Sequence, residues 1–188
     1  MKKGLIVGGV IVGVVVILIM MFSGTYNSLV SKEEEVDGKL SDISVQLERR
    51  ADLIPNLVST VKGYAKHEQA VIDSVTDARS KLVNADDAEE MAEANQELTS
   101  AINKLLVIVE NYPDLKANTN FIQLQDELAG TENRISVARN DYNEAVKDYN
   151  KTIKSFPKNI LAGMFDFDEK EYFEAKESSN EVPEVSFE

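Results

Sequence analysis

An uninterrupted apolar run over residues 4–22 constrains this chain more than any other feature. As a helix rising about 1.5 Å per residue, the run would measure roughly 28 Å, close to the thickness of the hydrocarbon core of a bilayer. A cleaved signal peptide is the alternative, because Lys2 and Lys3 precede the run, but no small-x-small cleavage site follows it. We therefore predict an uncleaved single-pass anchor over residues 1–24, which contacts the lipid bilayer through residues 4–22.

Two glycine spacings within the run predict a surface where transmembrane helices pack. Gly4 pairs with Gly8, and Gly9 pairs with Gly13, at the separation that lets two helix backbones approach closely. The side of the membrane reached by the rest of the chain stays open, because lysines flank the run at both ends.

Composition excludes several classes of function for the remaining residues. The formal net charge is −13 and the densest basic cluster is the pair Arg49 and Arg50, so we expect no nucleic-acid partner. The chain has no cysteine, which excludes disulfides, thiolate metal sites and a thiol nucleophile.

Apolar residues recur three and four positions apart along most of residues 25–157, as in amphipathic helices. Such stripes run through residues 26–54, 57–82, 91–108 and 121–156. Asp87 and Glu90 have the spacing of a capping box before the third stripe, and Pro157 ends the fourth. The pattern predicts an all-α fold, in which the N-terminal transmembrane helix is followed by an up-and-down four-helix bundle with long helices.

Pro55 admits two interpretations. The apolar spacing keeps its phase from Ile54 to Leu57, as one kinked helix would. A single rod would, however, leave part of its stripe facing water, whereas a chain reversal at Pro55 lets a four-helix bundle bury every stripe. Burial favours two separate helices.

The C-terminal residues 158–188 lose this periodicity and become strongly acidic. Ser178, Ser179, Asn180 and Pro183 interrupt any regular spacing. We expect an acidic, largely disordered tail.

Charged residues at stripe positions mark a candidate structural polar layer. Arg50 and Glu132 occupy positions that a helix would bury, and charges are costly to bury unless they are paired. A solvated edge of the bundle is the alternative. We hypothesise that Arg49 or Arg50 pairs with a carboxylate such as Glu132 and fixes the register of the helices.

No pattern of residues indicates an enzyme. His67 and Glu68 begin an H-E-x-x-H spacing, but position 71 is Val, so the second imidazole of a zinc site is missing. Nucleophile-elbow and phosphate-binding glycine motifs are missing as well. We predict no catalytic residues, no cofactor and no metal site.

Several segments resemble the LemA family, over residues 26–156. They are YNSLV (26–30), VQLERRADLIPNLV (45–58), VKGYAKHE (61–68), YPDLKA (112–117) and TENRI (131–135), while the acidic tail looks peculiar to this chain. The resemblance implies a bacterial, single-pass cell-membrane protein with a helical bundle and a poorly defined molecular function. It also implies a short N-terminus outside the cell, whereas the lysines that flank the apolar run weakly favour an N-terminus inside.

Two functions fit an anchored bundle without an active site best, and the less favoured alternatives are an enzyme and a small-molecule or metal sensor that uses the acidic faces. The first is a non-catalytic scaffold or adaptor for an unidentified protein partner at the membrane. The second is a structural protein that self-assembles into a homo-oligomer along the membrane surface. Helical bundles host many functions, so the pattern does not identify the partner.

Overall fold

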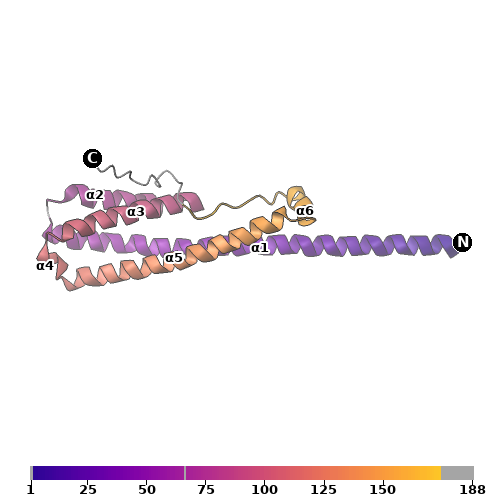
Figure 1. The fold of residues 1–188 in the computed structure, drawn as a ribbon, viewed down its shortest axis with the longest axis horizontal. Helices are drawn as coiled ribbons and strands as arrows, with labels where there is room; N and C mark the ends of the chain where they lie inside the picture. Colours follow the sequence, from indigo (N-terminus) through magenta and orange to yellow (C-terminus); the bar gives the residue numbers. More distant parts are fainter. Residues whose placement is uncertain (1, 66, 175–188) are drawn as a thin grey trace, which may run out of the picture. The chain divides into compact units, whose positions relative to one another are not determined.

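The chain folds into helices, as predicted. The computed structural model describes residues 2–65 and 67–174, without the side chains of residues 2–7, 10 and 18. The helices are α1 (Lys2–Tyr64), α2 (Gln69–Val83), α3 (Ala88–Val109), α4 (Pro113–Lys116), α5 (Thr119–Lys154) and α6 (Lys158–Met164) (Figure 1). No β-strand occurs among the described residues, which confirms the all-α class.

The first part of α1 carries the predicted apolar run on its surface. α1 is one helix of 63 residues, and its apolar end has a mean hydropathy of 1.8, enough in length and composition to cross a membrane. None of that apolar window is buried inside the protein, and Ile17 and Met20 are 58% and 69% exposed. Contact between such a surface and water is unfavourable.

The chain divides into two compact units, and the two long helices α1 and α5 contribute to both. One unit comprises Met1–Lys39 and Glu144–Lys170, and we call it the juxtamembrane unit. The other comprises Leu40–Asn143 and Glu171–Glu188, and we call it the bundle unit. The sequence predicted one folded region over residues 25–157, so this division is a feature that the stripes did not reveal.

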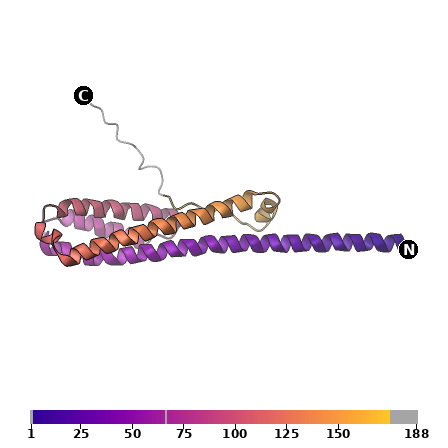
Figure 2. The same cartoon turned by 60° about the horizontal axis from the view of Figure 1, so that its bottom comes forward.

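The bundle unit packs four helical segments around one apolar core (Figure 2). The segments are the end of α1, α2, α3 and the first part of α5, and α4 lies in the connection between α3 and α5. Their buried side chains include Ile43, Leu47, Ile54, Leu57, Val61, Ile72, Val75, Leu98, Leu105, Phe121, Leu128 and Ile135. All but Ile72 are residues of the predicted stripes, because a helix buries positions three and four apart on one face.

The predicted start of the third helix is confirmed in atomic detail. Asp87 is the N-cap of α3, and its Oδ1 accepts a hydrogen bond of 2.7 Å from the backbone N–H of Glu90. Glu90 reaches back, and its Oε2 accepts a bond of 3.1 Å from the backbone N–H of Asp86. Both N–H groups would otherwise lack an intrahelical partner.

Pro55 lies inside α1, so the prediction that it separates two helices is wrong. Its missing N–H leaves the carbonyl of Ala51, four residues earlier, without its helical partner. The Nε of Arg79 on α2 donates a hydrogen bond of 2.8 Å to that carbonyl. The chain leaves α1 only after Tyr64 and α2 begins at Gln69, so the second predicted helix is divided between α1 and α2.

The juxtamembrane unit packs α6 and the end of α5 beside α1. Leu29, Val36, Tyr149, Ile153 and Leu161 are buried within it. Apolar side chains of α1 that follow the apolar run therefore have protein neighbours, in contrast to the run itself.

The C-terminal prediction needs correction for residues 158–174. Leu161 of α6 is 5% exposed and Phe173 is 2% exposed. In the bundle unit, the backbone N–H of Phe173 donates a hydrogen bond of 2.8 Å to Oδ1 of Asn143, and the hydroxyl of Tyr142 donates one of 2.9 Å to the carbonyl of Glu171. Residues 158–174 are ordered because these groups find buried partners, and residues 175–188 lie outside the described part of the chain.

Candidate functional site: a buried polar cluster and a surface groove

The most unusual side chain of the bundle unit is Arg50, which is buried in an otherwise apolar face of α1. Its neighbours on the stripe are Leu47 and Ile54, and Arg50 itself is only 4% exposed. A buried guanidinium is costly unless charged or polar groups meet it.

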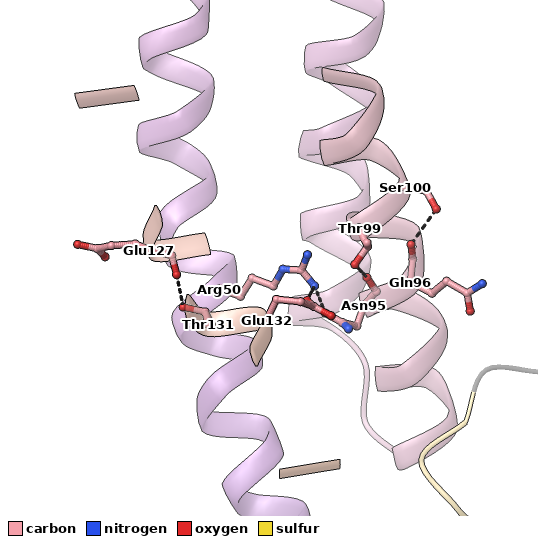
Figure 3. Close-up of polar contacts among 8 residues, drawn as sticks. All are labelled: Arg50, Asn95, Gln96, Thr99, Ser100, Glu127, Thr131 and Glu132. Carbon is pink, nitrogen blue, oxygen red and sulfur yellow. Dashed lines mark hydrogen bonds and ion pairs between the residues drawn. The ribbon is translucent and has the colours of Figure 1, made fainter. Parts of the chain in front are cut away.

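Asn95 of α3 and Glu132 of α5 meet Arg50 (Figure 3). Its Nη1 donates a hydrogen bond of 2.5 Å to Oδ1 of Asn95 and lies 2.5 Å from Oε2 of Glu132. The contact with Glu132 is an ion pair whose alignment is not that of a hydrogen bond, and the Nε of Arg50 has no hydrogen-bond partner among the described residues. Burial lowers the pKa of Arg50 below its ordinary value, and the charge of Glu132 opposes this shift.

Neighbouring polar groups satisfy one another around this cluster. Thr131 is fully buried, and its hydroxyl donates a hydrogen bond of 2.8 Å to the carbonyl of Glu127, one turn earlier on α5. The hydroxyl of Thr99 donates one of 2.9 Å to the carbonyl of Asn95 (Figure 3). The polar layer therefore joins α1, α3 and α5 through two buried side chains, Arg50 and Asn95, and the partly exposed Glu132.

The structure places the predicted residues of the layer differently. It brings together Arg50 and Glu132, whereas Arg49 is exposed. Asn95 was missed, although it is a polar residue three positions before the buried Leu98, and this spacing was a signal that could have found it. That the layer fixes helix register stays a prediction.

The predicted transmembrane packing residues have open surroundings. A side-chain carbon added at Gly8, Gly9 or Gly13 would meet no described atom within 4 Å apart from the neighbouring backbone of its own helix. Gly4 lies in α1, but its surroundings are outside the described side chains. The glycine surface is thus available to another helix, and its role in packing stays a prediction.

A groove of about 440 Å³ lies on the surface of the bundle unit. Its lining comes from α1 and α5: Asp42, Val45, Gln46, Asn133, Arg134, Val137, Ala138 and Asp141. Val45 and Val137 are 56% and 62% exposed, and Oε1 of Gln46 is buried without a hydrogen-bond partner among the described residues. The groove therefore combines apolar surface, charges of both signs and one acceptor without a donor.

A second polar cluster lies in the juxtamembrane unit around Lys170. Its Nζ lies 3.2 Å from Oε1 of Glu33 and 3.3 Å from Oδ1 of Asp37, and its backbone N–H donates a hydrogen bond of 3.0 Å to Oδ1 of Asn150. Burial opposes the charge of Lys170, but Glu33 and Asp37 together outweigh burial and raise the pKa of this lysine. Tyr149 is fully buried nearby, and burial followed by the charge of Glu33 raises the pKa of its phenol.

A comparison with known protein families decides the relationship of this chain. The model of the LemA family matches residues 39–187, most of the sequence. The chain belongs to the LemA family. The match extends through the acidic C-terminal residues, so the view that this tail is peculiar to the chain is wrong.

Curated relatives of this LemA-family chain share about a quarter of its residues. Protein LemA of Metamycoplasma hominis is 28% identical over 162 residues, which cover 86% of this chain and 74% of that protein. Magnetosome protein MamQ 2 of Paramagnetospirillum magneticum is 26% identical over 80% of this chain, and MamQ of Magnetospirillum gryphiswaldense is 24% identical over the same share. The chain spans 65% of the length of these two magnetosome proteins.

Glu68, the second residue of the incomplete H-E-x-x-H spacing, forms a hydrogen bond with a distant residue in this LemA-family chain. The hydroxyl of Tyr112 donates a hydrogen bond of 2.9 Å to Oε1 of Glu68, and this bond raises the pKa of Tyr112. Within the described residues, no group of three or more His, Asp or Glu side chains is arranged to hold a metal ion. Glu68 thus links the start of α2 to the loop before α4.

Proposed function

We propose that this LemA-family protein is a membrane-anchored, non-catalytic scaffold that binds a partner protein at the bacterial cell membrane. The observation that carries the proposal is the groove between α1 and α5, because it leaves apolar side chains exposed beside charged ones. Such a surface is typical of a docking site for an amphipathic helix.

The anchor part of the proposal rests on the apolar surface of α1. Its described side chains between residues 8 and 22 are exposed, and the helix is long enough to cross the bilayer through residues 4–22. A bilayer would cover this surface without any other protein. The rest of the chain, which carries the groove, would then be tethered to the membrane on one side.

The chemistry of the groove favours a partner helix with one apolar face and basic groups beside it. Val45 and Val137 offer apolar contact to side chains spaced three or four residues apart. The carboxylate of Asp42 lies at the lining and favours Lys or Arg on the partner. The net charge of −13 also favours a basic partner over an acidic one.

The test is a crosslinking comparison between two exposed valines. A photoreactive residue replaces Val137 in the groove or, as the matched control, Val107 of α3, which is 71% exposed and outside the groove lining. We expect the groove position to crosslink in cells to a protein unlike LemA and the control position not to do so. Val45→Asp should abolish the crosslink at Val137. Equal crosslinking at both valines, or recovery of LemA-like chains alone, would contradict the scaffold proposal.

Self-assembly is the second candidate, and the open glycine positions favour it. Gly9 and Gly13 face no other part of the described chain within 4 Å and lie on an apolar helix. Glycines at this spacing let two transmembrane helices pack closely, so a homo-oligomer would form through α1. Size analysis in mild detergent should then show an oligomer that Gly9→Leu with Gly13→Leu dissociates. A monomer before any substitution would rule out this function.

A further inference from the structure

The outer face of α6 is apolar although α6 already buries its inner face. Leu161 and Ala162 are 5% and 3% exposed and pack into the juxtamembrane unit. Ile160 and Met164, four residues apart on the other face, are 52% and 63% exposed. A helix that is apolar on both faces needs an apolar medium on the outside as well.

Two aromatic residues next to α6 extend this surface. Phe156, which precedes α6, is 81% exposed, and Phe165, which follows it, is 51% exposed. We call the set of Phe156, Ile160, Met164 and Phe165 the α6 patch. The patch is a short, continuous stretch of chain rather than a set of scattered side chains, which argues for one common environment.

Ring contacts place the α6 patch at a defined level along α1. The ring centroid of Tyr26 lies 5.0 Å from that of Phe165 and 5.8 Å from that of Phe167, with the rings edge to face. Figures 1 and 2 both show α6 beside α1. Tyr26 is four residues beyond Phe22, the last residue of the apolar run, so it lies about 6 Å further along the helix axis.

This level corresponds to the interfacial layer of a bilayer. The hydrocarbon core is about 30 Å thick and the whole bilayer about 40–45 Å, so each headgroup layer takes up roughly 5–8 Å. If residues 4–22 fill the hydrocarbon core, Tyr26 and Phe165 lie within the headgroup layer. Aromatic rings favour this layer, because one part of a ring contacts acyl chains while its surroundings stay polar.

The charges near the α6 patch are mixed in sign. Nζ of Lys154 lies 2.6 Å from Oε2 of Glu169 and is neutralised by it, while Lys158 and Asp168 lie in the same segment. Electrostatic attraction to anionic lipid is therefore weak, and burial of apolar side chains is the remaining driving force. Contact with lipid through this patch should persist in neutral lipid and at high salt.

We infer that α6 is an interfacial helix, which lies on the bilayer surface beside α1 and inserts Phe156, Ile160, Met164 and Phe165 among the lipid headgroups. The inference rests on the proposed membrane anchor. The lipid surface is favoured over a second copy of the chain, because four side chains are few against the about 20–30 residues that each partner gives to a standard protein interface. The patch is also continuous with the apolar run through Tyr26.

The experiment uses tryptophan as a depth reporter, because the natural chain contains none. Met164→Trp and Phe156→Trp report on the α6 patch, and both positions are exposed, so the core stays intact. Ile17→Trp reports on the anchor, and Glu35→Trp, on an exposed part of α1 beyond Tyr26, is the control in water. Each full-length variant is reconstituted in neutral vesicles whose lipids carry bromine either near the headgroup or near the end of the acyl chain.

We expect bromine near the headgroup to quench Trp at 164 and 156 more strongly than bromine at the chain end. The reverse order is expected for Trp at 17, and neither lipid should quench Trp at 35. High salt should leave the quenching at 164 unchanged.

Quenching at 17 without quenching at 164 and 156 would overturn the interfacial helix while leaving the anchor intact. Absence of quenching at 17 would overturn the anchor and the inference together. A blue-shifted emission at 164 that neither bromine quenches would show that protein, such as a second copy, covers the patch, and would also overturn the inference.

Discussion

Loss of Glu132 should destabilise the bundle unit more than loss of Arg50, although the two residues form one ion pair. The reason is their unequal burial. The side chain of Arg50 is 4% exposed, whereas that of Glu132 is 43% exposed and can return to water when its partner is removed. Glu132→Ala instead leaves a buried guanidinium with Asn95 as its remaining partner.

The magnitudes follow from what each substitution leaves behind. Removal of one partner from a buried ion pair costs about 3–5 kcal/mol, and we expect about 3 kcal/mol for Glu132→Ala, since Glu132 is partly hydrated. Arg50→Met removes the buried charge itself but leaves Oδ1 of Asn95 without a donor, at about 1–3 kcal/mol. The relieved desolvation of Arg50 offsets part of this cost, so we expect about 1 kcal/mol for Arg50→Met.

Urea and thermal unfolding of the full chain in detergent, followed by far-UV circular dichroism, measure both effects. A loss of about 3 kcal/mol corresponds to a decrease in Tm of roughly 6–12 °C for a protein of this size. Arg50→Met combined with Glu132→Ala should recover most of the loss, because the double variant has no buried charge. Glu97→Ala, which removes the exposed ion pair with Lys81, is the matched control and should cost less than about 1 kcal/mol.

Two results would refute this reasoning. If Arg50→Met destabilised the chain as much as Glu132→Ala, unequal burial would not govern the pair. If Arg50→Met left Tm unchanged, the polar layer would contribute nothing to stability, and the hypothesis that it fixes helix register would fail.

Three further predictions concern other buried or half-buried polar groups. Arg79→Met should cost about 1–3 kcal/mol of unfolding free energy, because it leaves the Ala51 carbonyl unpaired. In a Pro55→Ala background this cost should shrink, because residue 55 then donates to the same carbonyl. Equal costs in both backgrounds would refute the compensation. Tyr149→Phe should be neutral or stabilise by up to about 1 kcal/mol, since the buried hydroxyl has no hydrogen-bond partner among the described residues, and a clear decrease in Tm would contradict this. Lys170 has a raised pKa in the folded chain. Its contribution to the free energy of unfolding should therefore be full below the ordinary lysine pKa of about 10.4 and be lost as pH rises through the higher folded value. The difference in stability between the natural chain and Lys170→Met should stay constant near neutrality and shrink across alkaline pH.

Local chemistry made parts of this fold predictable. The start of α3 at Asp87 depends on side chains within one turn, so the capping box was sufficient to place it. The length of α5 follows from one unbroken stripe that ends before Pro157. Pro55 was misinterpreted because its effect is not local. The donor that compensates its missing N–H is Arg79, which lies on another helix and far along the chain.

By itself the sequence determined the helical class, the apolar surface of α1 and the stripe that buries Arg50, since these depend on spacing along a single helix. The tertiary structure alone decided that Asn95 completes the contacts of Arg50 and that Arg79 reaches Ala51. It also brought Phe165 to Tyr26. The physical reason is that the apolar spacing along one helix indicates which residues face the core. The register and rotation of each helix against its neighbours decide which of those residues contact one another.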